Sequence, residues 1–176
     1  MNRYTHSFIV LITLGLVACS SKQESTVETA TPSKEVDTET LKANLKSQVC
    51  AFLTIAEVAT ITGIAEEMGS VSGYDGTTGH YCSYNWNDFG KEIKFAYVFS
   101  TFGNIEKVAE SLAMFKASDS LEPVSLNVGE KAAFWGEGNS RLSVFYTDVQ
   151  LYVDMRKTDF TDKKSIAIKI VEKALE

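Results

Sequence analysis

The sequence predicts an α+β domain in which an antiparallel sheet of five to seven strands packs against about three helices, with one disulfide. Three observations predict this class. Runs of alternating apolar and polar residues, joined by short turns, indicate neighbouring antiparallel strands. Three stretches repeat apolar residues at helical spacing, and such faces need other elements to cover them. Two cysteines remain beyond residue 19, which is an even pair.

The first clearly marked helix is predicted to be about eight residues long and to begin after Thr54. Thr54 and Glu57 fit a capping box, in which the hydroxyl and the carboxylate each satisfy a backbone N–H group. Leu53 and Val58 occupy the two positions of a hydrophobic staple. Gly63 suits a left-handed C-cap, so we expect the helix to end there.

The segment Gly63–His80 holds five of the eleven glycines. We expect a Gly-rich loop here, with at most one edge strand around 67–72. The segment lacks the Gly-Lys-Ser/Thr core that reaches phosphates in phosphate-binding loops. A turn between strands is therefore favoured, and a loop that binds a small ligand over one end of the sheet is the alternative.

The rest of the chain supplies the other strands and helices. Residues 81–86 and 91–99 alternate in polarity around an Asn-Asp-Phe-Gly turn, which predicts a hairpin. Asn104 is the expected N-cap of a helix whose apolar stripe reaches Phe115. Pro123 marks the loop that follows it. Three more strands and a last helix are expected over about 131–135, 142–146, 149–155 and 162–175.

The first eighteen residues have the parts of a secretory signal peptide. Arg3 supplies the positive charge, and Phe8–Val17 is an apolar stretch of about ten residues, half of the roughly 20 that a bilayer span requires. Leu16-Val17-Ala18-Cys19 resembles the lipobox of bacterial lipoproteins. The resemblance implies cleavage before Cys19 and acylation of its sulfur with chains such as palmitate, which anchors the protein to a membrane. An ordinary cleaved signal is the alternative.

The residues after the cleavage point define the predicted organisation of the mature chain. Residues 19–47 are interpreted as the lipidated Cys and a flexible linker, because they are rich in Ser, Thr, Glu and Lys. A short helix over 38–49 can lead into the single domain, placed at 48–176. Ser20 follows the Cys, and the resemblance to sorted lipoproteins implies the outer membrane, facing the periplasm, if the host is Gram-negative.

The charge of the chain argues against two classes of partner. The net charge is −6, and Arg3 is the only charged residue of the signal peptide, so the mature chain carries −7. Nucleic-acid binding depends on Lys and Arg that neutralise phosphates, and this excess of acidic residues argues against it. The same excess argues against a basic patch that docks on anionic lipid headgroups.

Export to an oxidising compartment predicts a disulfide between Cys50 and Cys82. His80 is the only histidine of the mature chain. A zinc site or an activated nucleophile at His80 would have to recruit one of these cysteines, which the disulfide removes. We therefore predict no catalytic residue, no metal site and no cofactor.

Three short motifs resemble those of small exported bacterial domains. They are Cys50-Ala-Phe-Leu-Thr-Ile-Ala-Glu-Val58, Tyr81-Cys82-Ser-Tyr84 and Val128-Gly-Glu-Lys-Ala-Ala-Phe-Trp135. Many of these domains are lipoproteins of unknown function, and some share the fold of the photosystem accessory protein PsbP and the nuclear import factor Mog1. The resemblance covers most of 49–176 and implies a binding or accessory module without chemistry.

Aromatic residues on the strands give the one candidate contact surface. Phe145 and Tyr152 stand opposite the apolar face of their predicted strands, where exposed aromatics often mark an interface. In a sheet covered on both faces they would be core instead. The function predicted from the sequence is thus a membrane-tethered, non-enzymatic binding or accessory module outside the cytoplasm, with an envelope protein as the expected kind of partner.

Overall fold

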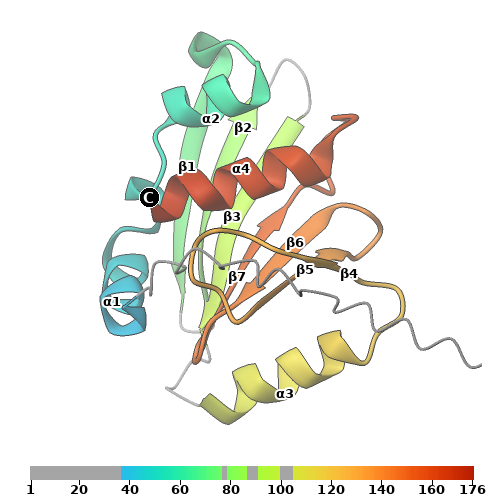
Figure 1. Ribbon diagram of the computed structural model, residues 1–176. Coiled ribbons are helices and arrows are strands. Elements are labelled where there is room, and N and C mark those ends of the chain that lie inside the picture. The colour runs from blue at the N-terminus through green and yellow to red at the C-terminus, as the bar shows by residue number, and fades with distance from the viewer. Residues whose placement is uncertain (1–36, 77–78, 87–90, 100–104) are drawn as a thin grey trace, which may run out of the picture. The chain divides into compact units, whose positions relative to one another are not determined.

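The computed structural model describes residues 37–176, apart from 77–78, 87–90 and 100–104 (Figure 1). Cys19, the predicted signal peptide and most of the predicted linker lie outside the described residues, as does the expected N-cap Asn104. None of the helices in the described part of the chain is long and apolar enough to cross a membrane.

Seven strands and four α-helices are present in the described residues. The strands are β1 (Gly69–Gly76), β2 (Gly79–Trp86), β3 (Lys91–Phe99), β4 (Glu122–Val124), β5 (Ala132–Gly136), β6 (Arg141–Phe145) and β7 (Val149–Asp154). The helices are α1 (Thr38–Gln48), α2 (Ile55–Thr62), α3 (Ile105–Lys116) and α4 (Lys163–Leu175), with short 3₁₀ turns η1 (Val49–Ala51) and η2 (Glu66–Met68).

All seven strands form one antiparallel sheet in the order β1-β2-β3-β7-β6-β5-β4. The predicted α+β class is therefore confirmed, with the sheet at the upper end of the expected size. The three-residue strand β4 was not predicted, because Pro123 indicated a loop. Pro is compatible with this place because β4 is an edge strand, where one N–H need not join the ladder.

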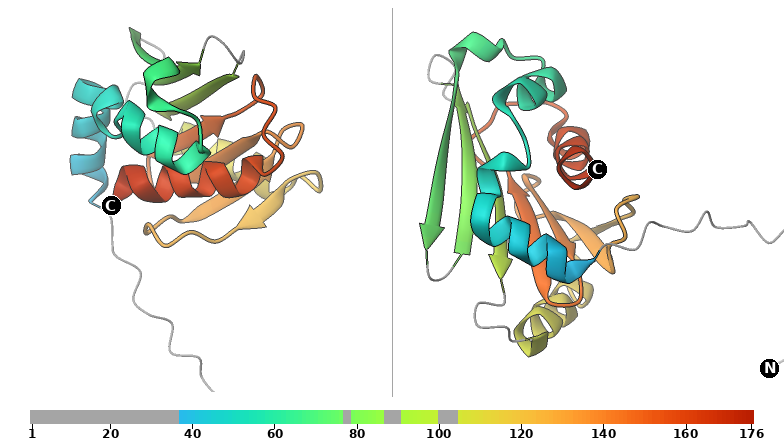
Figure 2. Two further views of the ribbon diagram at one scale, coloured as in Figure 1. Left: turned by 90° about the horizontal axis from the view of Figure 1, so that it is seen from above. Right: turned by 90° about the vertical axis from the view of Figure 1, so that its left-hand side faces the viewer.

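Three helices, α1, α2 and α4, lie together on one face of the sheet (Figure 2). Alternate strand residues point into this layer because successive side chains of a strand face opposite sides. Most of the largest fully buried side chains of the strands belong to it, namely Tyr84, Trp86, Ile93, Leu142 and Leu151. Ala167, Ile170 and Val171 of α4 close the core from above.

The start and end of α2 follow the predicted chemistry. The Thr54 hydroxyl accepts from the backbone N–H of Glu57 at 3.2 Å, and the Glu57 carboxylate accepts from the N–H of Thr54 at 2.8 Å. Gly63 has φ of +72°, a left-handed conformation that Gly adopts without the steric cost of a Cβ. The capping box and the glycine C-cap are both confirmed.

The Gly63–His80 segment contains the expected edge strand, which extends further along the chain than the predicted range 67–72. Most of it forms η2 and the edge strand β1, which pairs with β2 from Gly69 to Gly76. A Cβ at Gly69 would lie 2.8 Å from Cδ1 of Ile55, so the glycine allows α2 to pack close to the sheet. The small-ligand alternative, which assigned binding to the Gly63–His80 segment, stays a prediction.

The folded part of the chain also begins earlier than predicted. Helix α1 lies within the region interpreted as linker, yet Leu41 is buried in the main core and Lys42 pairs with Asp148. Asp37 caps the helix by accepting from the N–H of Glu39 at 3.1 Å. Leu41 and Lys42, which were interpreted as linker, thus belong to the folded part, because a polar stretch gives little compositional signal of contact with a core.

The Cys50–Cys82 disulfide is present and joins η1 to β2, with the two Cα atoms 5.1 Å apart. Cys82 is fully buried on the helix-covered face. Gly73 of β1 lies against this bond, because a Cβ there would be 3.1 Å from Sγ of Cys50. The bond therefore fastens the chain before α2 to the β1–β2 end of the sheet.

Candidate functional site

The second face of the sheet has two halves of different composition. On β5 and β6, helix α3 packs over Phe134 and Phe145, and its own Phe115 lies with its ring centroid 5.0 Å from that of Phe145. Val108 of α3 is buried in the same cluster. We call this region, formed by Val108, Phe115, Phe134 and Phe145, the aromatic half. It is a second, smaller core.

The other half of this face carries charged and hydroxyl-bearing residues. The strand register aligns four outward positions in one row across the sheet: Ser83 on β2, Lys94 on β3, Asp154 on β7 and Arg141 on β6. We call this region the polar half and define it by Tyr74, Tyr81, Ser83, Glu92, Lys94, Arg141, Tyr152 and Asp154, together with Arg156 and Lys157 just after β7.

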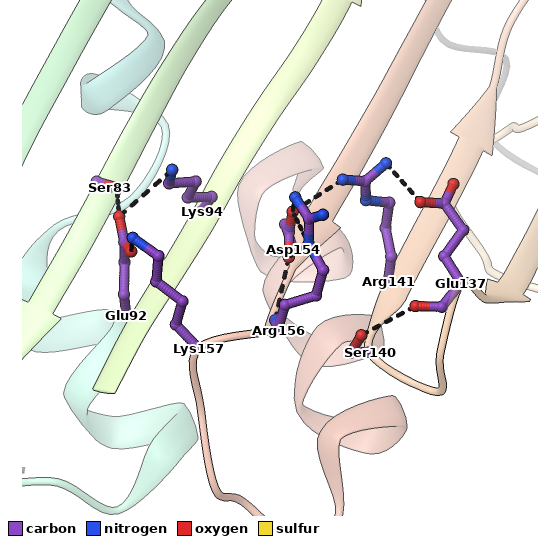
Figure 3. A network of polar contacts seen from close by, with 9 residues as sticks. All are labelled: Ser83, Glu92, Lys94, Glu137, Ser140, Arg141, Asp154, Arg156 and Lys157. Atoms are coloured by element: carbon purple, nitrogen blue, oxygen red, sulfur yellow. Dashed lines mark hydrogen bonds and ion pairs between the residues drawn. The ribbon is translucent and has the colours of Figure 1, made fainter. Parts of the chain in front are cut away.

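Asp154 is the centre of one charge cluster (Figure 3). Its carboxylate accepts from Nη2 of Arg141 at 2.9 Å and from Nη2 of Arg156 at 2.6 Å. The side chain is only 6% exposed. Burial alone would raise the pKa of the Asp154 carboxyl, but the hydrogen bonds from Arg156 and Arg141 outweigh it and lower the pKa to about 2. Asp154 is therefore ionised throughout the neutral range.

Glu92 is the centre of a second cluster beside the first (Figure 3). It accepts from the Ser83 hydroxyl at 2.9 Å and lies 2.5 Å from Nζ of Lys157 and 3.5 Å from Nζ of Lys94. Burial opposes ionisation of Glu92, but the bonds from Lys157 and Ser83 prevail and lower its pKa. Glu92 also carries a negative charge at neutral pH.

Tyrosines occupy the next row of outward positions beside these clusters. The guanidinium of Arg141 lies 4.8 Å from the centroid of the Tyr152 ring, and Nζ of Lys94 lies 5.4 Å from that of Tyr81. Both distances are within the range of a cation–π contact. The Tyr81 ring stacks on Tyr74 with centroids 5.1 Å apart, and Tyr74 is half exposed at the edge of the sheet.

The two aromatic residues predicted to form a contact surface have different environments. Phe145 is fully buried beneath α3, so its assignment to a surface was wrong. Its strand alternation gave the correct face, but it could not show that α3 returns to cover that half. Tyr152 is half-buried in the polar half, and its role in contact stays a prediction.

A hollow of about 330 Å³ opens in the polar half, lined by Glu92, Lys94, Asp154, Arg156 and Lys157. Sequence reasoning missed Arg156 and Lys157 as site residues. The available signal was the charged run that directly follows an alternating strand. Within the described residues no group of three or more His, Cys, Asp or Glu side chains is arranged to hold a metal ion.

The charges in this hollow suit binding better than acid–base chemistry. A general base works best when its pKa is near the working pH. The pKa values of Asp154 and Glu92 are instead lowered from their ordinary acidic values. Each carboxylate also already accepts hydrogen bonds or ion pairs from two or more donors. What the hollow offers a ligand is a set of cationic side chains fixed in place.

Comparisons with known proteins do not identify the chain. No protein-family model matches it, and no curated protein or solved structure gives a significant match. The resemblance to small exported lipoprotein domains therefore stays a prediction.

Proposed function

We propose that this protein is a membrane-tethered binding or accessory module outside the cytoplasm, and that the polar half is its contact surface. The observation that carries the proposal is the contrast across one sheet face. One half is closed by an aromatic helix, while the other holds tyrosines and ordered charges around an open hollow. Aromatic and Arg side chains are the types most enriched where proteins meet partners.

The cost of maintaining the polar half supports a binding role. Burying Glu92 and Asp154 is unfavourable unless each is paired, and a buried ion pair is often no more stabilising than apolar residues of similar volume. Apolar residues fill the equivalent positions in the aromatic half. The charges are therefore not required to cover this face of the sheet, and this favours recognition as their function.

The tether is the second part of the proposal and depends on Cys19, which the described residues do not include. Metabolic labelling of cells with a palmitate analogue should mark the wild-type chain and leave Cys19→Ser unmarked. Two acyl chains hold a protein on a membrane far longer than one chain does. The wild type should consequently sediment with membranes, and the variant should not. Equal labelling of both chains would rule out the lipid anchor.

Site-specific photo-crosslinking in cells tests the contact surface. A photoreactive phenylalanine analogue replaces Tyr74 or Tyr152 in the polar half, and in the control it replaces Lys169, exposed on α4. We expect the two tyrosine positions to give the same discrete adduct and the α4 position to lack it. An identical adduct pattern at all three positions would contradict the assignment of the polar half.

A further inference from the structure

We infer that the polar half recognises an acidic segment of another protein, whose carboxylates bind the outward cations Lys94, Arg156 and Lys157. The inference deepens the proposed function and rests on it, because it names the chemistry of the partner at the same surface. Three cations and two carboxylates line the hollow, so its formal charge is positive although the chain as a whole is acidic.

Exposure increases this local excess of positive charge at the surface. The carboxylates are recessed, with Glu92 16% and Asp154 6% exposed, whereas Arg156 is 62% and Lys157 is 68% exposed. Fields decay within a Debye length of about 8 Å at physiological salt. An approaching group therefore meets the exposed cations before it meets either buried carboxylate, and an anion is attracted.

The cations keep donors for a ligand after their internal contacts are made. Arg156 uses Nε and Nη2 on Asp154, and a guanidinium has five N–H donors. Lys157 contacts one oxygen of Glu92, and an ammonium has three donors. Both side chains can bind a partner carboxylate without giving up the internal ion pairs.

The recessed carboxylates hold these donors in position. Long basic side chains lose rotamer entropy on binding, about 0.5–1.5 kcal/mol for each one immobilised. Asp154 takes three hydrogen bonds from the Arg156 side chain, and Glu92 pairs with both Lys157 and Lys94. Part of this rotamer entropy is therefore lost when the protein folds. Less remains to be lost when the partner binds, so the affinity is higher.

A peptide fits the site better than a uniform polyanion. The mature chain carries −7, so its net charge repels a membrane or nucleic acid of high charge density. A short segment that places a few acidic residues in the hollow avoids that repulsion. The stacked Tyr74 and Tyr81 rings beside it offer an apolar surface to a neighbouring side chain.

The test uses the full chain in a non-ionic detergent and two fluorescent peptides. One is a decapeptide of alternating Glu and Leu, and the other has every Glu replaced by Gln. We expect the Glu peptide to bind about tenfold or more tightly than the Gln peptide at low salt, with the difference reduced in 0.5 M NaCl, since screened surface charges contribute little. Equal binding of the two peptides, or none at millimolar protein, would overturn the inference.

Matched lysine variants locate the binding. Lys157→Gln should weaken Glu-peptide binding about three- to tenfold, and Arg156→Gln/Lys157→Gln should weaken it further. Lys169→Gln makes the same charge change on exposed α4 and should leave the affinity unchanged. Thermal unfolding checks that the variants remain folded. Equal losses in Lys157→Gln and Lys169→Gln would show that net charge acts alone, which contradicts a site.

Two further results separate this inference from the proposed function. Vesicles with anionic lipid should bind no better than neutral vesicles; binding that depends on Lys157 would show a lipid surface instead of a peptide. If photo-crosslinking at Tyr152 still traps one partner while neither peptide binds, the contact surface stands and the acidic chemistry is wrong. If neither experiment gives position-dependent binding, both proposals fail.

Discussion

Phe145 and Tyr152 show how differently two halves of one sheet face can be used. They lie on adjacent strands β6 and β7 and face the same side, because Ser143, two residues before Phe145, pairs with Tyr152. Phe145 is completely buried among aromatic rings of α3 and β5, while Tyr152 lies under the Arg141 guanidinium in the polar half. The difference teaches that strand alternation determines the face of a side chain, whereas a distant helix determines whether that face is covered.

The two halves also differ in how they are held to the rest of the domain. The aromatic half is fixed by apolar contact with α3. The β1–β2 end of the polar half is fixed from the opposite face, by the Cys50–Cys82 bond and by α2 packed against Gly69. Attachment of this part of the sheet therefore does not depend on covering the polar half.

The largest expected effect is the loss of the Phe145 ring from the aromatic half. Phe145→Ala should lower the free energy of unfolding by about 3–5 kcal/mol, because it removes apolar contacts and leaves a cavity between α3 and β6. Chemical denaturation followed by tryptophan fluorescence measures the change. A loss below about 1 kcal/mol would show that α3 does not form a core there, and that the two halves are alike.

Removal of the disulfide tests the attachment of the other half. The bond spans a sequence separation of 32 residues, for which the chain-entropy account gives about 3–4 kcal/mol. Cys50→Ala/Cys82→Ala should lower the melting temperature by many degrees. Thiol titration of the denatured, unreduced Cys19→Ser chain should find no free thiol. Two free thiols in protein exported by its normal route would refute the bond.

Acid should lower the stability of the fold by protonating Asp154 in the polar half. Its folded-state pKa of about 2 is below the ordinary value of 3.8, so its ion pairs stabilise the fold fully above about pH 5, and this contribution is lost as pH falls toward 2. The shift corresponds to about 2 kcal/mol. Asp154→Asn should be less stable than wild type at pH 7 by at least this amount, and the gap should narrow on acidification. Denaturant midpoints from pH 2 to 7 measure it, and a gap independent of pH would contradict the assignment.

The sequence predicted local structure better than the contacts between elements that are distant in the chain. The capping box at Thr54, the C-cap at Gly63 and the hairpin strands follow from interactions within a few residues, so patterns in the chain are sufficient. The disulfide was predictable because only two cysteines follow Cys19. The edge strand β1 was expected only over 67–72, because glycines weaken strand propensity. Gly69 and Gly73 are explained by the close approach of Ile55 and Cys50 from elsewhere in the chain.

The candidate site was less predictable than the fold for the same reason. Tyr152 was identified from its position opposite apolar residues, but its partner Arg141 comes from another strand. Asp154 could not be distinguished from other carboxylates, because its significance arises only when Arg141 and Arg156 converge on it. Charged residues at outward strand positions read as ordinary solvated surface until the register places them in one row.

The smallest expected effect on stability, and the sharpest contrast with Phe145, is at Tyr152. Tyr152→Ala removes a half-buried ring and its cation–π contact with Arg141, so it should cost about 1 kcal/mol, well below the loss at Phe145. Tyr152→Phe keeps the ring and should be close to neutral. If the polar half is the contact surface, Tyr152→Ala should nevertheless reduce the adduct formed by a photoreactive group at position 74, whereas Tyr152→Phe should retain it. Denaturation and crosslinking yield are measured on the same variants. A stability loss as large as that at Phe145 with unchanged crosslinking would mean that Tyr152 serves the core, and that the two halves do not divide stability from recognition.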